Sequence, residues 1–72
     1  MIPKLDLHGI KHEEVSDYCD KFMTSIWGEY DCVDIVTGNS IVMRKAVIEA
    51  LDCYDVEISV SMSNPAILRV FL

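Results

Sequence analysis

Residues 32–47 read CVDIVTGNSIVMRKAV, and the pattern of this stretch changes at its middle. Cys32 to Thr37 is rich in β-branched residues, which favour an extended strand. Gly38-Asn39 is typical of a tight turn, and Ser40 is a favourable residue for the N-cap of a helix. From Met43 onward the apolar residues recur at helical spacing. The stretch therefore predicts a strand, a turn and a helix in direct succession.

The flanking segments continue the alternation of strands and helices. Period-two alternation predicts strands at about residues 4–8, 56–62 and 67–72, and helical spacing predicts a first helix from about 11 to 29. Asn64-Pro65 predicts the turn between the last two strands. The predicted order of elements is therefore βαβαββ.

This order predicts one α/β domain over residues 1–72, a two-layer sandwich with a mixed four-stranded sheet and two helices on one face. Right-handed crossovers through the helices make the first three strands parallel, and the last strand joins in an antiparallel hairpin. The predicted inner face consists of Leu5, Leu7, Val33, Ile35, Val56, Ile58, Val60, Leu68 and Val70. The predicted outer face, expected to be solvated, carries Asp6, His8, Asp34, Glu57, Ser59, Ser61 and Arg69.

Composition restricts the functional classes. The chain has 72 residues, 12 acidic and 6 basic side chains and a formal net charge of -6. This balance opposes a general attraction to phosphate, so a nucleic-acid-binding role requires a local basic patch. The 51% hydrophobic content excludes a disordered chain. No targeting segment or membrane-spanning run is visible, which predicts a cytoplasmic protein without membrane contact.

Two groups of conspicuous residues are predicted to pack in the core rather than to carry function. The cysteines are odd in number and have no close pair, which argues against a disulfide framework or a zinc site and predicts reduced, buried or half-buried thiols. Helical spacing favours core packing over base stacking for most aromatic residues. The residues concerned are Cys19, Cys32 and Cys53, and Tyr18, Trp27, Tyr30 and Tyr54.

The carboxyl ends of the predicted parallel strands converge at one edge of the sheet, which is where open α/β sheets bind ligands. His8-Gly9, Thr37 to Ser40 and Ser63-Asn64 are expected there. Asp6 and His8, two residues apart in a strand, point the same way, and such a pair can act as general base and acid or share a metal or water. The alternative is an ordinary exposed aspartate and histidine.

The same edge has features that favour an anion. The amides of Gly38, Asn39 and Ser40 lie at the start of a predicted helix, where a phosphate can dock, although an ordinary capped turn has the same sequence. Positive groups in the first turns of both helices are expected at this edge. They are Lys11, His12, Arg44 and Lys45.

Two further surfaces are candidates on the outer face of the sheet. The carboxylates of Asp6, Asp34 and Glu57 are a possible divalent-cation site, although such faces are more often simply solvated. An exposed apolar strip is expected to mark a contact with a protein partner or a second copy. Its residues are Val36, Ile67 and Phe71.

The motif LDLHG, residues 5–9, resembles the signature of the Smr, or small MutS-related, domain family. The resemblance covers nearly the whole chain. IVTG (35–38) is similar to the family's second motif, MRKAV (43–47) to its second helix and ILRVFL (67–72) to its last strand. The family's fold is similar to the C-terminal domain of bacterial translation initiation factor three, which implies the same βαβαββ order.

The resemblance also implies a function. Smr domains are associated with nucleic-acid binding and, in several members, with DNA-nicking or RNA-cleaving endonuclease activity. By this resemblance Asp6 and His8 are the candidate catalytic pair and Thr37-Gly38 the adjoining substrate loop. A requirement for Mg²⁺ or Mn²⁺ is left open, as is a non-catalytic role in binding nucleic acid or protein. The full expected substrate-binding set is Gly9, Lys11, Thr37, Gly38, Asn39, Ser40, Arg44 and Lys45.

Overall fold

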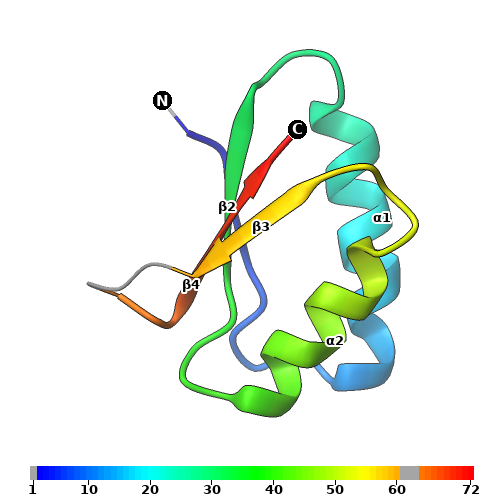
Figure 1. Ribbon diagram of the computed structural model, residues 1–72. Helices are drawn as coiled ribbons and strands as arrows, with labels where there is room; N and C mark the ends of the chain where they lie inside the picture. Colours follow the sequence, from blue (N-terminus) through cyan, green and yellow to red (C-terminus); the bar gives the residue numbers. More distant parts are fainter. Residues whose placement is uncertain (1, 61–63) are drawn as a thin grey trace.

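A computed structural model describes residues 2–60 and 64–72 as a four-stranded sheet with two α-helices on one face (Figure 1). The predicted α/β order is confirmed, with a short 3₁₀ helix, η1, added before α1. The predicted positions of Ser61, Met62 and Ser63 lie outside the described residues. The elements are β1 (Lys4–Asp6), η1 (His12–Glu14), α1 (Val15–Ile26), β2 (Cys32–Val36), α2 (Ile41–Leu51), β3 (Glu57–Val60) and β4 (Ile67–Phe71).

The strands are ordered β1-β2-β4-β3, so the last strand of the chain occupies an interior position. β1 pairs with β2 in parallel, and β4 pairs antiparallel with both β2 and β3. The side chains of Leu68 and Val70 in β4 are fully buried, whereas Ile58 in β3 is half-buried. The more apolar strand thus takes the position with two neighbours, and the strand with two polar residues forms the edge.

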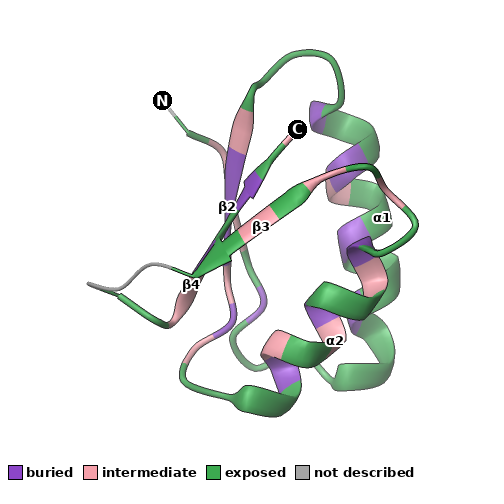
Figure 2. Ribbon diagram, viewed as in Figure 1, coloured by how far each residue is buried: buried purple, intermediate pink, exposed green. Residues whose placement is uncertain are grey.

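The core fills the space between the sheet and the helices (Figure 2). α2 contributes Met43, Val47 and Leu51, which are four residues apart and therefore share one face of the helix. Val60, expected on the inner face, is 44% exposed because it ends the edge strand β3. The buried apolar residues are Leu7, Val15, Cys19, Met23, Ile26, Val33, Ile35, Met43, Val47, Leu51, Leu68 and Val70.

The first strand ends two residues earlier than predicted, and this changes the geometry of the expected catalytic pair. The Asp6 carboxylate accepts a hydrogen bond from the backbone N–H of His8 (2.9 Å), and Gly9 turns the chain with a φ of 83°. A side chain that bonds the backbone two residues on competes with strand pairing. The prediction that His8 belongs to the same strand as Asp6 is therefore wrong, because His8 lies in a turn.

The outer face of the sheet is not solvated throughout. Asp34 is 7% exposed, because Arg69 on the adjacent strand donates from Nε to its Oδ1 (2.9 Å) and from the guanidinium to its Oδ2 (3.3 Å). This hydrogen bond raises the pKa of Arg69. Asp34 is thereby engaged, and within residues 2–60 and 64–72 no group of three or more His, Cys, Asp or Glu side chains is placed to hold a metal ion.

The predicted core packing of aromatic and cysteine residues holds only in part. Cys19 is buried and Cys32 half-buried, but Cys53 is exposed at the end of α2. Trp27 is 51% exposed, because α1 ends at Ile26 and Gly28, with a φ of 85°, redirects the chain. Tyr18 and Tyr30 are also exposed. No helix in the described part of the chain is long and apolar enough to span a membrane.

The thiols should react in the order of their exposure. Burial raises the pKa of the Cys19 thiol to about 11, and only the thiolate is nucleophilic. In the native protein we expect a disulfide reagent at pH 8 to modify Cys53 at least about a hundredfold faster than Cys19. The Cys53→Ser variant should lose the fast phase of modification, and mass spectrometry measures the extent of modification over time. Equally fast modification of Cys19 would show that the core opens freely.

Candidate active site

The candidate site lies where β1 and β2 end side by side. Their parallel register pairs Asp6 with Val36, and the backbone N–H of Leu7 donates to the Val36 carbonyl (2.9 Å), which extends the pairing by one residue. Leu7 is fully buried and fixes the point at which the chain leaves the sheet. The next residue, His8, is therefore exposed directly beside the loop that follows β2.

The His8 ring lies against Gly38. A Cβ built on Gly38 would be 3.8 Å from Cδ2 of the imidazole, so the absence of a side chain leaves space beside the ring. Gly38 also has a φ of 68°, which side-chain-bearing residues rarely adopt. Among the described residues, no group is hydrogen-bonded to the ring nitrogens. The imidazole is thus placed to exchange a proton with a bound molecule.

Asp6 acts on the backbone of His8. Its Oδ1 accepts the His8 amide hydrogen, and the amide of Ile10 donates to the Leu7 carbonyl (3.0 Å), so two hydrogen bonds close this turn. Asp6 is exposed and remains beside the site. The contact that the structure gives it is a positioning contact, made through the main chain of His8.

Thr37 holds the adjoining loop in place through hydrogen bonds within the protein. It is 3% exposed, its amide donates to the Ala66 carbonyl (2.8 Å), and its hydroxyl lies 3.2 Å from the same oxygen and 3.0 Å from the Gly38 carbonyl. These bonds connect the end of β2 to the turn that precedes β4. The sequence does not predict this role for Ala66, because bonding through a backbone carbonyl carries no residue-specific signal.

Ser40 and Arg44 also have structural partners. The Ser40 hydroxyl accepts from the amide of Met43 (3.1 Å) and so caps α2 as predicted. The Arg44 guanidinium donates to the Pro65 carbonyl (2.9 Å), and its buried Nε has no partner among the described residues. Arg44 therefore connects α2 to the segment before β4 while its side chain stays half-buried.

The backbone of the loop offers hydrogen-bond donors. In the described part of the chain, no group accepts from the amides of Gly38, Asn39 or Ser40. They precede α2, an 11-residue helix whose amino end carries a partial positive charge. This geometry favours an anion at the start of α2.

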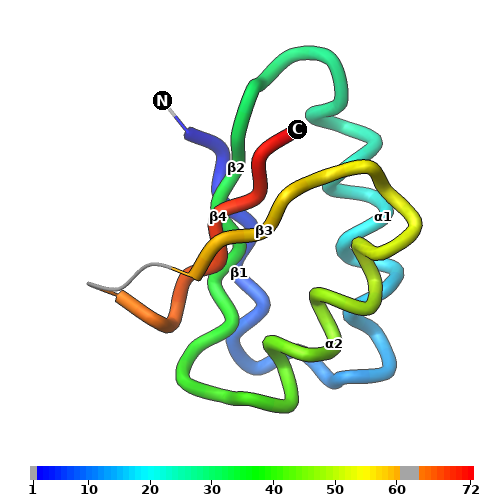
Figure 3. The backbone as a smooth tube through the Cα atoms, in the orientation of Figure 1, coloured from blue at the N-terminus to red at the C-terminus, as the bar shows by residue number. Residues whose placement is uncertain are grey.

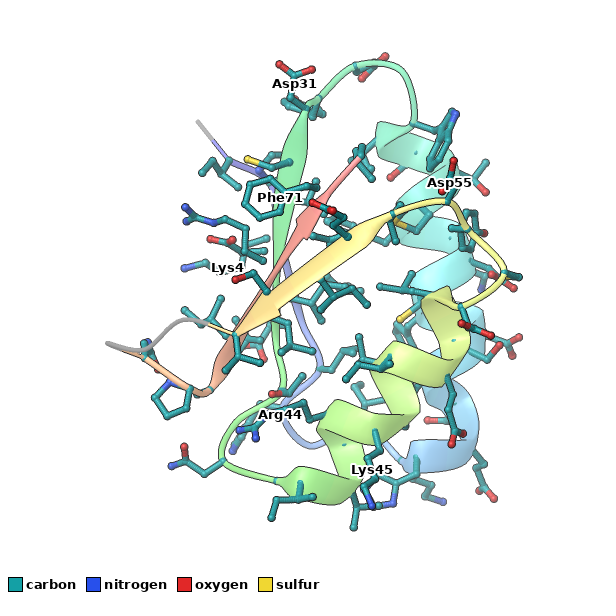
Figure 4. The ribbon with its side chains drawn as sticks, viewed as in Figure 1. Lys4, Asp31, Arg44, Lys45, Asp55 and Phe71 are labelled. Carbon is teal, nitrogen blue, oxygen red and sulfur yellow. The ribbon has the colours of Figure 1, made fainter. Side chains whose placement is uncertain are left out.

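Exposed positive groups occur at the same end of the molecule. The segments that lead into α1 and into α2 lie at the same end of the molecule in Figure 3. Lys11 and His12 lie in the first of these segments, and Lys45 lies about one turn into α2. Figure 4 shows Arg44 and Lys45 at this end and Asp31 and Asp55 at the opposite end. The predicted convergence of basic residues is consistent with this placement, and the acidic residues Asp6, Glu13 and Glu14 lie at the same end.

Comparison with known proteins identifies one family. The model of the Smr domain matches residues 5–65 and therefore includes the His8 turn, the Gly38 loop and both helices. A search of curated proteins found no match, and a search of solved structures found none.

The Ser40 cap generates a stability prediction. Ser40→Ala removes the acceptor for the Met43 amide and should lower the free energy of unfolding by about 1 kcal/mol. Ser40→Asp keeps a capping oxygen and should retain wild-type stability. Urea denaturation with an unchanged m-value would measure the difference. Equal midpoints for all three proteins would show that α2 starts without this hydrogen bond.

Proposed function

Because the chain belongs to the Smr domain family, which is associated with nucleic-acid binding and nuclease activity, we propose that it cleaves a phosphodiester bond at the edge formed by His8 and Gly38. The observation that carries this proposal is the exposed imidazole beside a glycine loop whose amides have no acceptor among the described residues. A group that transfers protons and a set of fixed amide donors supply two contributions to phosphodiester hydrolysis, namely acid–base catalysis and stabilisation of the developing charge.

The proposed chemistry divides between the two sides of the site. An attacking water or ribose hydroxyl forms a bond to phosphorus and loses a proton, and the leaving oxygen gains one as its bond to phosphorus breaks. His8 transfers one of these protons through a ring nitrogen. The amides of Gly38 and Asn39 donate to the phosphoryl oxygens, on which negative charge accumulates.

The remaining candidate residues position or attract the substrate. Lys11 and Lys45 are exposed and supply positive charge to neighbouring phosphates. Thr37, Ser40 and Arg44 act through the bonds that fix the loop, so they hold the amides in place rather than reach for the substrate. A Mg²⁺ or Mn²⁺ requirement is tested by the same experiment as cleavage.

Removing the imidazole should abolish cleavage and preserve binding. With labelled DNA and RNA panels and Mg²⁺, Mn²⁺ or chelator, His8→Ala should lower the cleavage rate by about 10²–10⁴-fold, because general acid or base catalysis contributes that much. Its affinity for the uncut substrate should stay within about twofold. Folding of each variant is checked by circular dichroism.

His12→Ala is the matched control, because His12 is the other histidine and is exposed in η1 at the same end. The cleavage rate of His12→Ala should be no more than about threefold below that of the wild type, because His12 is an exposed side chain outside the His8–Gly38 contact. Wild-type cleavage by His8→Ala would contradict the catalytic role. Binding without cleavage by the wild type would reduce the function to nucleic-acid recognition.

Asp6 offers a second test. Asp6→Asn keeps an oxygen that can accept the His8 amide hydrogen, whereas Asp6→Ala does not. If Asp6 acts by fixing the turn, Asn should retain cleavage within about threefold and Ala should lose about tenfold, the value of one hydrogen bond. Equal losses in both variants would show that the carboxylate charge itself is needed.

A further inference from the structure

The end of the molecule opposite the candidate site carries an exposed aromatic surface, formed by Trp27, Tyr30 and Tyr54 and called here the aromatic end. Trp27 is 51% exposed and Tyr30 42% exposed, whereas Tyr54 is half-buried. The rings of Trp27 and Tyr54 pack with centroids 5.9 Å apart and planes tilted by 41°. These residues come from the connections after α1 and after α2, which Figure 1 places away from the site.

The aromatic pair is held in a defined position. The Tyr54 hydroxyl donates to Asp20 Oδ1 on α1 (3.0 Å), and this hydrogen bond raises the pKa of Tyr54. The amide of Trp27 donates to the Met23 carbonyl (2.9 Å), which fixes the residue at the end of α1. A large indole that is fixed by its neighbours and left half in water adds little to the core, so its exposed face is available to a partner.

The charged residues of the two connections, residues 27–31 and 52–56, are all acidic. No lysine, arginine or histidine occurs between residues 22 and 43 or between residues 46 and 68 of the sequence. Figure 4 shows Asp31 and Asp55 at this end, one on each connection. The acidic residues on or beside the two connections are Asp20, Glu29, Asp31, Asp52 and Asp55.

We infer that the aromatic end is a docking surface for a basic, arginine- or lysine-bearing segment of a protein partner. A cation over the Trp27 or Tyr54 ring gains a cation–π contact, and the surrounding carboxylates attract the same charge. Nucleic acid does not fit this surface, because stacking a base on these rings would bring its phosphates among the carboxylates. The partner therefore binds away from the proposed cleavage site, and both surfaces can be occupied together.

The test uses a synthetic peptide of alternating arginine and glycine and a matched peptide with citrulline in place of arginine. Trp27 is the single tryptophan, so its fluorescence reports on this surface directly. We expect saturable fluorescence change with the arginine peptide, weakened by salt, and none with the citrulline peptide. Amide NMR shifts should concentrate in residues 27–31 and 52–56.

Two double variants separate the local effect from net charge. Asp31→Asn with Asp55→Asn should weaken peptide binding at least about fivefold, since two attractive charges are lost beside the rings. Glu14→Gln with Asp17→Asn makes the same change in net charge at exposed positions at the start of α1 and should leave binding within about twofold. Trp27→Ala should weaken peptide binding by about fivefold or more, and this is measured by NMR because the variant has no tryptophan.

Several outcomes would overturn the inference. They are equal binding of the citrulline peptide, NMR shifts centred elsewhere, equal weakening by both double variants, or no saturation by about 1 mM peptide. Sedimentation would also show whether the protein associates with itself. If both Lys45→Glu and Asp55→Asn abolished such self-association, the occupant of the aromatic end would be the basic edge of a second copy and not a separate partner.

Discussion

The parallel pairing of β1 with β2 is the constraint on which the candidate site depends. Three residue pairs and two additional backbone hydrogen bonds set the register, one from the Leu7 amide to the Val36 carbonyl and one from the Asp34 amide to the Pro3 carbonyl. A shift by one residue would turn Leu7 out of the core and move His8 away from Gly38. The burial of Leu7 therefore does more than stabilise the fold, since it determines which residue emerges beside the loop before α2. Packing free energy and site geometry are coupled here through a single side chain.

The loop that faces His8 is held by bonds made inside the protein. Thr37 connects it to Ala66, Ser40 caps the helix that follows, and Arg44 reaches the Pro65 carbonyl. These contacts engage three side chains that would otherwise serve as ligands, and in the described part of the chain they leave the backbone amides of the loop without an acceptor. A donor set of fixed amides requires little reorganisation when charge develops on a phosphate, which is the condition for electrostatic catalysis.

The sequence predicts the elements well because their signals are local. Alternation identifies the strands, and Ser40 marks the start of α2 correctly. The errors arise where a side chain bonds a group that the local pattern does not include. Asp6 ends β1 by bonding the His8 amide, and Asp34 is buried because Arg69 stands opposite it in the antiparallel register. The interior position of β4 and the outward placement of Trp27 likewise depend on tertiary packing rather than on spacing.

The size of the molecule reduces the conflict between a net charge of -6 and the proposed phosphate-binding role. The molecule measures 29 × 27 × 19 Å, whereas the Debye length in physiological salt is about 8 Å. Carboxylates such as Asp31 and Asp55, at the far end, are therefore screened from a phosphate beside Lys45. Net charge governs the long-range approach and lowers the association rate at low salt, while the local groups govern the bound state.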